Sequence, residues 1–163
     1  MPVQKLKEFL DTQKVKYVAI SHSAAFTAQE IAASAHVSGH ELAKIVMVKL
    51  DGELAMAVLP ASYKVDLNAL QGAANAKQVE LAGEQEFRSR FAECELGAMP
   101  PFGNLYDMQV YVDQSLTKDE VIAFNAGSHT ELIKLSYKDF ERLVKPRVLK
   151  FATLQVGAAG SGR

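Results

Sequence analysis

The sequence predicts an α+β fold, with a mixed, mostly antiparallel sheet and helices around it. Residues 44–50 (KIVMVKL) and 53–60 (ELAMAVLP) are nearly unbroken apolar runs of strand length. Asp51-Gly52 between them is a typical two-residue hairpin turn, so these runs form a central antiparallel pair that is buried on both faces. Apolar residues at helical spacing near both ends and in the middle of the chain add helices beside the sheet.

The first third of the chain predicts two helices and a short strand. Val3, Leu6 and Leu10 recur at helical spacing and indicate a helix over residues 3–13. Residues 17–20 (YVAI) then indicate a strand.

A capping box opens the second helix. The Thr27 hydroxyl and the Glu30 carboxylate are spaced to satisfy free amides at a helix start. Ile31 and the alanines that follow supply its apolar side, and we expect Gly39 to end it.

The second half predicts further short elements. Asp66 is placed to cap a short helix that runs through Leu70, and Ser136 to cap a closing helix over residues 137–144. The other expected elements are a helix over residues 84–91, an irregular segment over 94–104, a strand over 106–112, and a hairpin of residues 120–124 and 131–135.

Composition limits the class of protein. Lys and Arg number 18 against 19 Asp and Glu, apolar residues make up 48%, and the formal charge is −1. This balance excludes a disordered chain and a collagen-like repeat, and it argues against a protein that binds nucleic acid through a general basic field. We also expect no DNA partner. We expect one domain over residues 1–152 and a Gly/Ala/Ser-rich tail or linker over 153–163.

Neither a signal peptide nor an apolar run of membrane-spanning length is visible. Cys94 is the single cysteine, which excludes an internal disulfide, so we expect a cytoplasmic protein without a membrane partner.

Several common types of reactive site lack support. His36 and His40 have helical metal spacing, but Gly39 separates them and no third ligand is near, so we expect no metal and no cofactor. Cys94 has no adjacent base or cation that would make it a thiolate. Ser128, like Ser62, lacks the flanking glycines of a nucleophile elbow.

Two features point to ligand binding. The segment 97–103 (GAMPPFG) joins prolines, which fix the backbone, to glycines, which allow a ligand to approach it closely. Such a loop can hold amides in fixed directions toward a carbonyl or an oxyanion. Lys44, a cation at the start of an apolar strand, is a candidate contact for a phosphate or a carboxylate.

The order of these segments resembles the YbaK/ProX family of aminoacyl-tRNA editing domains, which are related to the insertion domain of bacterial prolyl-tRNA synthetase. The resemblance covers residues 3–145, and its most specific elements are Lys44 with Gly97 and Pro101, which lie four apart. It also includes Leu59-Pro60, Asp66-Leu67, Tyr111-Val112-Asp113, Ala126-Gly127-Ser128-His129 and residues 136–140.

This resemblance implies the fold of that family and a deacylase that hydrolyses the ester of a mischarged tRNA. The loop of Gly97 and Pro101 would place the ester carbonyl and a water, assisted by the ribose hydroxyl and amino group of the substrate, and Lys44 would contact the terminal phosphate or the amino-acid end. The expected partners are the tRNA acceptor end and, as a second candidate, an aminoacyl-tRNA synthetase. The residues expected to bind substrate are Ile45, Met47, Ala98, Met99, Pro100, Phe102, Gly103, Gly127, Ser128 and His129.

Two questions stay open at this stage. Alanine, proline and cysteine are all candidate amino acids, because one methylene changes binding by only about 1–3 kcal/mol. The competing interpretation is a non-catalytic module of the same fold that recognises an aminoacyl group or a nucleotide.

Overall fold

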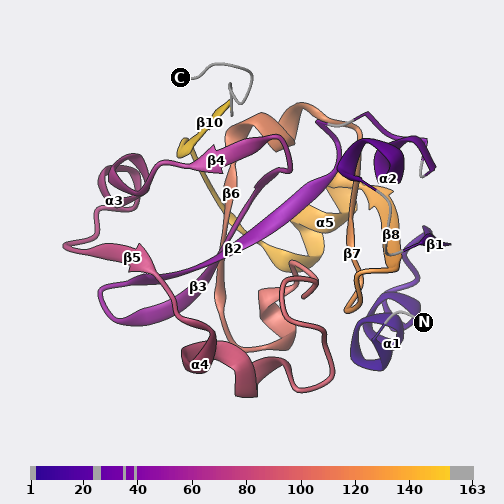
Figure 1. The fold of residues 1–163 in the computed structure, drawn as a ribbon, viewed down its shortest axis with the longest axis horizontal. Helices are drawn as coiled ribbons and strands as arrows, with labels where there is room; N and C mark the ends of the chain where they lie inside the picture. Colours follow the sequence, from indigo (N-terminus) through magenta and orange to yellow (C-terminus); the bar gives the residue numbers. More distant parts are fainter. Residues whose placement is uncertain (1–2, 24–26, 35, 39, 155–163) are drawn as a thin grey trace.

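The computed structural model describes residues 3–23, 27–34, 36–38 and 40–154 (Figure 1). Its largest sheet has five strands in the order β5-β2-β3-β6-β9. These strands are β2 (Ala43–Leu50), β3 (Glu53–Pro60), β5 (Val79–Leu81), β6 (Gln109–Asp113) and β9 (Arg147–Leu149). The pairs β2–β3 and β2–β5 are antiparallel, whereas β3–β6 and β6–β9 are parallel.

Two smaller sheets complete the architecture, and both are antiparallel. One has the order β1-β8-β7, and the other pairs β10 with β4. Their strands are β1 (Tyr17–Ser21), β4 (Tyr63–Val65), β7 (Val121–Asn125), β8 (Glu131–Ser136) and β10 (Ala152–Leu154). The predicted fold class, with a mixed and mostly antiparallel sheet, is confirmed.

The helices begin largely where their capping residues predict. Asp66 accepts a hydrogen bond from the Ala69 N–H, and Ser136 accepts one from the Asp139 N–H. Thr27 and Glu30 form the expected reciprocal capping box. The helices are α1 (Gln4–Thr12), α2 (Ala28–Ser34), α3 (Leu67–Ala74), α4 (Glu84–Phe87) and α5 (Tyr137–Val144), with 3₁₀ turns at Arg88–Phe91, Gly103–Leu105 and Gln114–Lys118. Gly39, the expected end of the second helix, lies outside the described residues.

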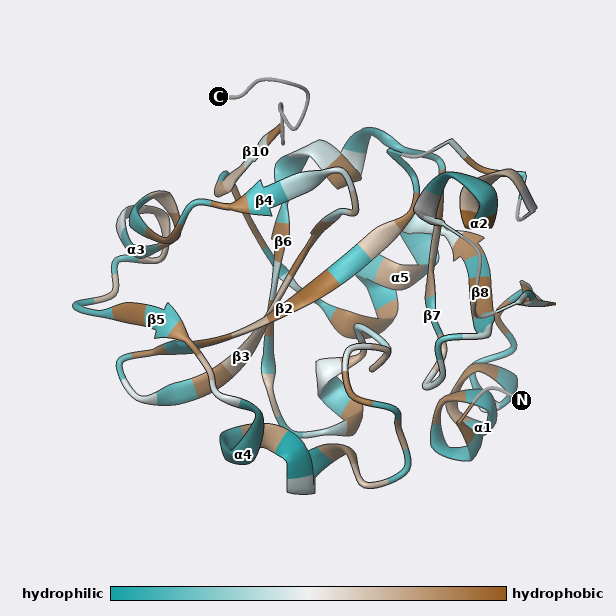
Figure 2. Cartoon of the chain, in the orientation of Figure 1, coloured by the Kyte–Doolittle hydropathy of each residue, from teal (hydrophilic) through white to brown (hydrophobic). Residues whose placement is uncertain are grey.

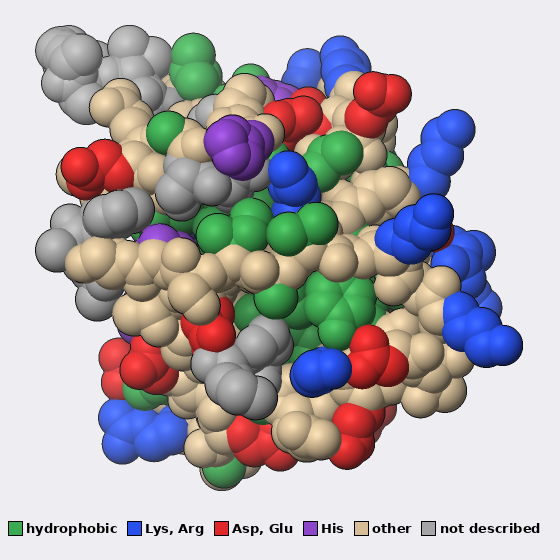
Figure 3. Space-filling model, turned by 90° about the vertical axis from the view of Figure 1, so that its right-hand side faces the viewer, with side chains coloured by type: hydrophobic (Ala, Val, Ile, Leu, Met, Phe, Trp, Pro, Cys, Tyr) green, Lys and Arg blue, Asp and Glu red, His purple; other side chains and the backbone are tan. Residues whose placement is uncertain are grey.

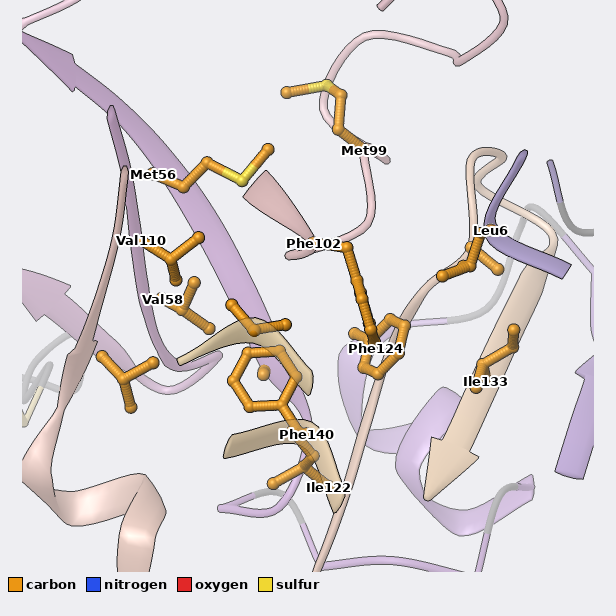
Figure 4. Packing of buried hydrophobic residues seen from close by; sticks show 14 of the residues in the cluster. Leu6, Met56, Val58, Met99, Phe102, Val110, Ile122, Phe124, Ile133 and Phe140 are labelled. Atoms are coloured by element: carbon orange, nitrogen blue, oxygen red, sulfur yellow. The ribbon is translucent and has the colours of Figure 1, made fainter. Parts of the chain in front are cut away.

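Strand β2 packs against a core on each face, as the apolar run predicts, and Figure 2 shows that most of its residues are hydrophobic. Ile45 and Met47 face a core that also holds side chains of α1, α5, β7 and β8. Figure 4 shows the centre of this core, where the Phe102 ring lies 5.5 Å from those of Phe124 and Phe140. Val46 and Val48 face a second core with Leu70 and Phe151. Consecutive residues of β2 therefore point into different cores.

One strand starts later than the sequence predicts. The expected strand over residues 106–112 is observed as β6, Gln109–Asp113. Before it, the N–H groups of Tyr106 and Met108 both donate to the Gly103 carbonyl, and Asp107 has a φ of 57°. This tight turn prevents an extended backbone before Gln109.

A buried carboxylate attaches the C-terminal segment to β6. Asp113 is 2% exposed. Its Oδ1 accepts hydrogen bonds of 2.8 Å from the N–H groups of Phe151 and Ala152, and its Oδ2 accepts one of 2.5 Å from the Ser115 hydroxyl. Strand β10 continues to Leu154, two residues past the expected domain boundary, and residues 155–163 lie outside the described part. Within the described segments, no helix has the length and apolar character needed to cross a membrane.

Candidate functional site

The site is built around an unpaired stretch of the β2 edge. On one side of β2, Leu42 is bridged to Ala123 of β7. Further along, the Ala82 N–H donates to the Met47 carbonyl and β5 pairs from Val48 onward. Between these contacts, the described part of the chain places no strand beside residues 44–46. Because Met47 directs its carbonyl to this side, Ile45 two residues earlier directs its N–H and C=O the same way.

Lys44 lies at this unpaired edge without a partner. Its side chain is half-buried, and no hydrogen bond or ion pair joins it to another described residue. Burial lowers the pKa of the Lys44 ammonium below its ordinary value, because loss of water penalises the charged form. Lys44 is paired with Leu59, so its side chain leaves β2 on the face opposite to Ile45.

A cavity of about 350 Å³ opens on the Ile45 face of the same edge. Its walls join β2 to the link between β5 and α4 and to the loop that precedes Pro100. The lining residues are Ile45, Val46, Met47, Leu81, Ala82, Glu84, Phe87, Leu96, Gly97 and Met99. Lys44 is not among these residues. The cavity and the Lys44 cation therefore lie on opposite faces of one strand edge.

The turn between β7 and β8 holds the loop over residues 95–103, which we call the glycine loop. The Gly127 N–H donates to the Ala98 carbonyl at 2.9 Å, and the Glu95 N–H donates to the Gly127 carbonyl at 2.8 Å. The His129 N–H donates to Glu95 Oε1 at 2.6 Å, and its Nε2 lies 2.9 Å from the Leu96 carbonyl. A carbonyl only accepts, so Nε2 carries the proton. These bonds fix the loop from both ends of its exposed part.

Gly97 is the exposed apex of this loop. Its φ is +88°, a conformation that side chains other than glycine rarely adopt. A Cβ at this position would lie 3.3 Å from His129 Cε1. The Gly97 N–H points to the Met99 sulfur at 3.2 Å, whereas the Met99 N–H has no hydrogen-bond partner among the described residues. The loop therefore presents one free amide and one amide covered by a thioether.

The second half of the loop belongs to the core. Ala98 and Phe102 are 0% exposed, and Pro100 and Pro101 are buried. Gly103 is buried too, and a Cβ there would collide with the Met108 carbonyl oxygen. In this structure Phe102 and Gly103 are packing residues and do not form a ligand surface. Phe102 packs in the aromatic core, and Gly103 packs closely against the start of β6.

Other candidates have structural partners. His40 Nδ1 lies 3.0 Å from Asp119 Oδ2. The Ser128 hydroxyl contacts that of Thr130 at 3.2 Å inside the turn. Burial raises the pKa of the Cys94 thiol, which lies 3.7 Å from the Tyr106 hydroxyl. Sequence reasoning missed the role of Glu95, which accepts a hydrogen bond from the His129 N–H. Its position two residues before Gly97 was a signal, but its partner lies far along the chain.

Comparisons with known proteins show the family to which the chain belongs. The family model for the aminoacyl-tRNA editing domain matches residues 22–143. "Prolyl-tRNA editing protein ProX" of Acetoanaerobium sticklandii is 24% identical over 153 residues, covering 90% of this chain and 93% of that protein. "Multifunctional Ser/Thr-tRNA deacylase ProXp-y" of Escherichia coli is also 24% identical over 153 residues, covering 91% of each chain.

The fold has solved counterparts as well. A crystal structure described as "a putative trans-editing enzyme for prolyl tRNA synthetase" aligns with a TM-score of 0.79 at 17% identity, covering 93% of this chain and 96% of that one. Since the family model spans most of the sequence, and its match includes the β2 edge, the glycine loop and the β7–β8 turn, the chain belongs to the aminoacyl-tRNA editing domain family.

Proposed function

We propose that this chain hydrolyses the ester that joins an amino acid to the terminal adenosine of a mischarged tRNA. The observation that carries the proposal is the shared edge of β2, which has an apolar cavity and a fixed glycine loop on one face and an unpaired cation on the other. In the reaction, the oxygen of water bonds to the ester carbonyl carbon and the bond to the ribose oxygen breaks. The ribose oxygen leaves with a proton that water supplied.

The substrate would lie across the strand edge. The amino-acid side chain enters the cavity beside Ile45 and Met47, and the ester carbonyl approaches the free Met99 amide and, once the Met99 sulfur moves aside, the Gly97 amide. On the other face, Lys44 is available for a phosphate of the terminal nucleotides. Its half-buried ammonium gains a counter-charge that the described protein residues do not give it.

Positioning supplies much of the catalysis in this proposal. Holding water and ester in a reactive geometry contributes up to about 7–11 kcal/mol. Backbone amides directed at a developing oxyanion add to this, because they are already oriented before the reaction begins. The buried Pro101 serves this role by restricting the backbone of the loop, and Gly97 lets the substrate approach the main chain closely. Gly127 and His129 hold the loop in place.

The cavity favours amino acids whose side chains are small and uncharged. Its walls near the loop are the apolar side chains of Ile45, Met47, Leu96 and Met99. Apolar contacts separate substrates that differ by one methylene by only about 1–3 kcal/mol, so related amino acids are expected to be hydrolysed at measurable rates.

A deacylation panel tests the proposal. We expect the purified protein to hydrolyse at least one of tRNAs charged with alanine, serine, cysteine, proline or threonine, with little activity on a bulky aromatic ester. Lys44→Met is the matched inactive variant, and release of labelled amino acid is the measurement. A folded protein that binds these tRNAs but hydrolyses none would instead identify a non-catalytic aminoacyl-binding module.

The proposal also covers the partner that supplies the substrate and the location of the protein in the cell. The name of the structural neighbour supports an aminoacyl-tRNA synthetase as a partner that supplies mischarged tRNA. A cytoplasmic location and the lack of a DNA partner are part of the same proposal, supported by the single cysteine and the net charge of −1.

A further inference from the structure

The small sheet β1-β8-β7 leaves half of one face uncovered. At one end of this face, Leu132 and Ala123 pack with Ile31 of α2. Toward the other end, Val18 of β1 is 51% exposed, although it stands in the sheet next to Lys134. A large apolar side chain at the surface of a sheet is a candidate contact for a partner.

Two adjoining hollows follow the uncovered half. One, of about 230 Å³, is lined by Lys16, Tyr17, Val18, Val121, Lys134, Leu135 and Ser136. The other, of about 530 Å³, is lined by residues 117–121 and 136–138. They are neighbours, because both are lined by Val121 and Ser136, and we call the two hollows together the lysine groove.

The charge of the lysine groove is mostly positive. Its lining holds Lys16, Lys118, Lys134 and Lys138 against two carboxylates, and one of these, Asp119, is already bound to His40. Among the described residues, no ion pair joins Lys16, Lys118 or Lys138 to a carboxylate. Figure 3 faces the side of the molecule on which β1 and β8 lie in Figure 1, and it shows Lys and Arg side chains along one edge of that face.

We propose that the lysine groove binds the phosphate backbone of the tRNA acceptor arm. This inference rests on the proposed function. A local excess of cations on a chain with a net charge of −1 is suited to a polyanion, since phosphate contacts with lysines release bound counterions. Val18, which is 51% exposed, adds apolar surface against which a ribose or an unpaired base packs.

The β7–β8 hairpin connects the groove to the site. Val121 and Ser136 pair at the groove end of this hairpin, and its turn carries His129 beside Gly97 at the other end. Five strand residues span roughly 17 Å. One RNA strand that leaves the groove along this hairpin therefore reaches the cavity with its 3′ end.

Two double variants test the inference. Lys16→Glu with Lys138→Glu reverses two exposed lysines of the groove, and Lys77→Glu with Lys150→Glu makes the same charge change on exposed lysines outside it. The probes are an uncharged acceptor-stem hairpin RNA, whose binding is measured by fluorescence anisotropy, and two esters of the same amino acid, on tRNA and on adenosine monophosphate.

We expect the groove variant to bind the hairpin RNA at least tenfold more weakly, and the logarithmic salt dependence to fall by about 1 for each lost phosphate contact. KM for the aminoacyl-tRNA rises, while hydrolysis of the short ester is unchanged. Equal RNA binding by both double variants would overturn the inference, as would a wild-type dimer that the groove variant splits without loss of RNA binding.

The two proposals fail in different ways. If neither ester is hydrolysed but the hairpin RNA still binds in a manner that depends on Lys16 and Lys138, the deacylase proposal fails and the groove remains supported. If both esters are hydrolysed equally by all proteins, the groove inference fails alone. Thermal melting of each variant checks that these exposed substitutions leave the fold intact.

Discussion

The two ends of β2 carry lysines in opposite electrostatic situations. Lys49 Nζ lies 2.6 Å from Glu86 Oε1 and 3.5 Å from Glu80 Oε2, and these partners raise the pKa of its ammonium. Lys44 has no such partner in the described residues, and burial lowers the pKa of its ammonium. One end of the strand is thus neutralised by the protein itself, while the Lys44 ammonium at the other end has no counter-charge among the described residues.

The cavities at the two ends of β2 differ in volume and in the residues that line them. The hollow near Lys49, of about 620 Å³, is larger, and its lining includes Glu53, Glu86, Arg90 and Asp107. The cavity near Lys44 is smaller, but a fixed loop with a free amide forms part of its wall. Volume alone therefore does not distinguish the two ends in the way that our proposal needs; the proposal rests on the unpaired cation and the free amide at the Lys44 end.

The largest expected effect comes from removing the unpaired cation. Lys44→Met should lower kcat/KM for the aminoacyl-tRNA by about 10- to 100-fold, because a charge-assisted contact with a phosphate contributes about 1.5–3 kcal/mol. The melting temperature should stay equal or rise, because a half-buried charge without a partner is lost. Steady-state deacylation and thermal melting measure both effects. Full activity in the folded variant would remove Lys44 from the site.

A second, smaller effect is expected to distinguish two glycines with nearly the same φ angle. Gly97 has a φ of +88° and His129 next to its missing side chain, whereas Gly52, in the turn at the Lys49 end, has a φ of +86° and no atom within 4 Å. Valine at either position stores backbone strain of about 1–3 kcal/mol. We expect Gly97→Val to reduce kcat about tenfold, and Gly52→Val to reduce only stability. Equal activities, compared at a temperature where both are folded, would make the loop a mere connector.

The smallest effect is a difference in pH dependence. An anion contact with Lys44 requires its ammonium, so binding of uncharged tRNA should weaken as the pH rises through the lowered pKa of Lys44, before an ordinary lysine would titrate. This step should vanish in Lys44→Met and persist in Lys49→Met. A profile that is identical in all three proteins would contradict the assignment.

Stability should respond to pH with opposite signs at the two lysines. The folded pKa of Lys44 lies below its unfolded value, so the penalty of burying its charge is relieved as the pH rises through that interval. The folded pKa of Lys49 lies above its unfolded value, so its favourable contribution is complete below the unfolded pKa and is lost as the pH rises through the folded one. Chemical denaturation of the two methionine variants across alkaline pH measures the difference.

Local features of the fold were predictable from the sequence, whereas distant contacts were not. The Asp51-Gly52 turn and the caps at Thr27 and Ser136 depend on neighbouring residues, and each was found as expected. The parallel pairing of β3 with β6 joins segments far apart in the chain, and no local pattern specifies it.

The same limit applies to the site. Lys44, Gly97 and Pro101 were identified through a family resemblance, but the sequence did not show that Lys44 and Ile45 lie on different faces of one strand edge. Nor did the composition of the loop reveal that Gly97 is exposed while Phe102 is buried. Glu95 was missed because its bond to the His129 N–H depends on tertiary structure.

The Asp113 carboxylate has a consequence for biosynthesis. Two of its hydrogen-bond donors, the N–H groups of Phe151 and Ala152, are among the last parts of the described chain to be made. Strand β9, which borders β6, is also translated late. During synthesis, the Asp113 carboxylate therefore lacks these hydrogen-bond donors, and the edge of β6 stays unpaired, until these residues have left the ribosome. A nascent chain that stops before Arg147 would expose this edge to chaperones or to other incomplete chains.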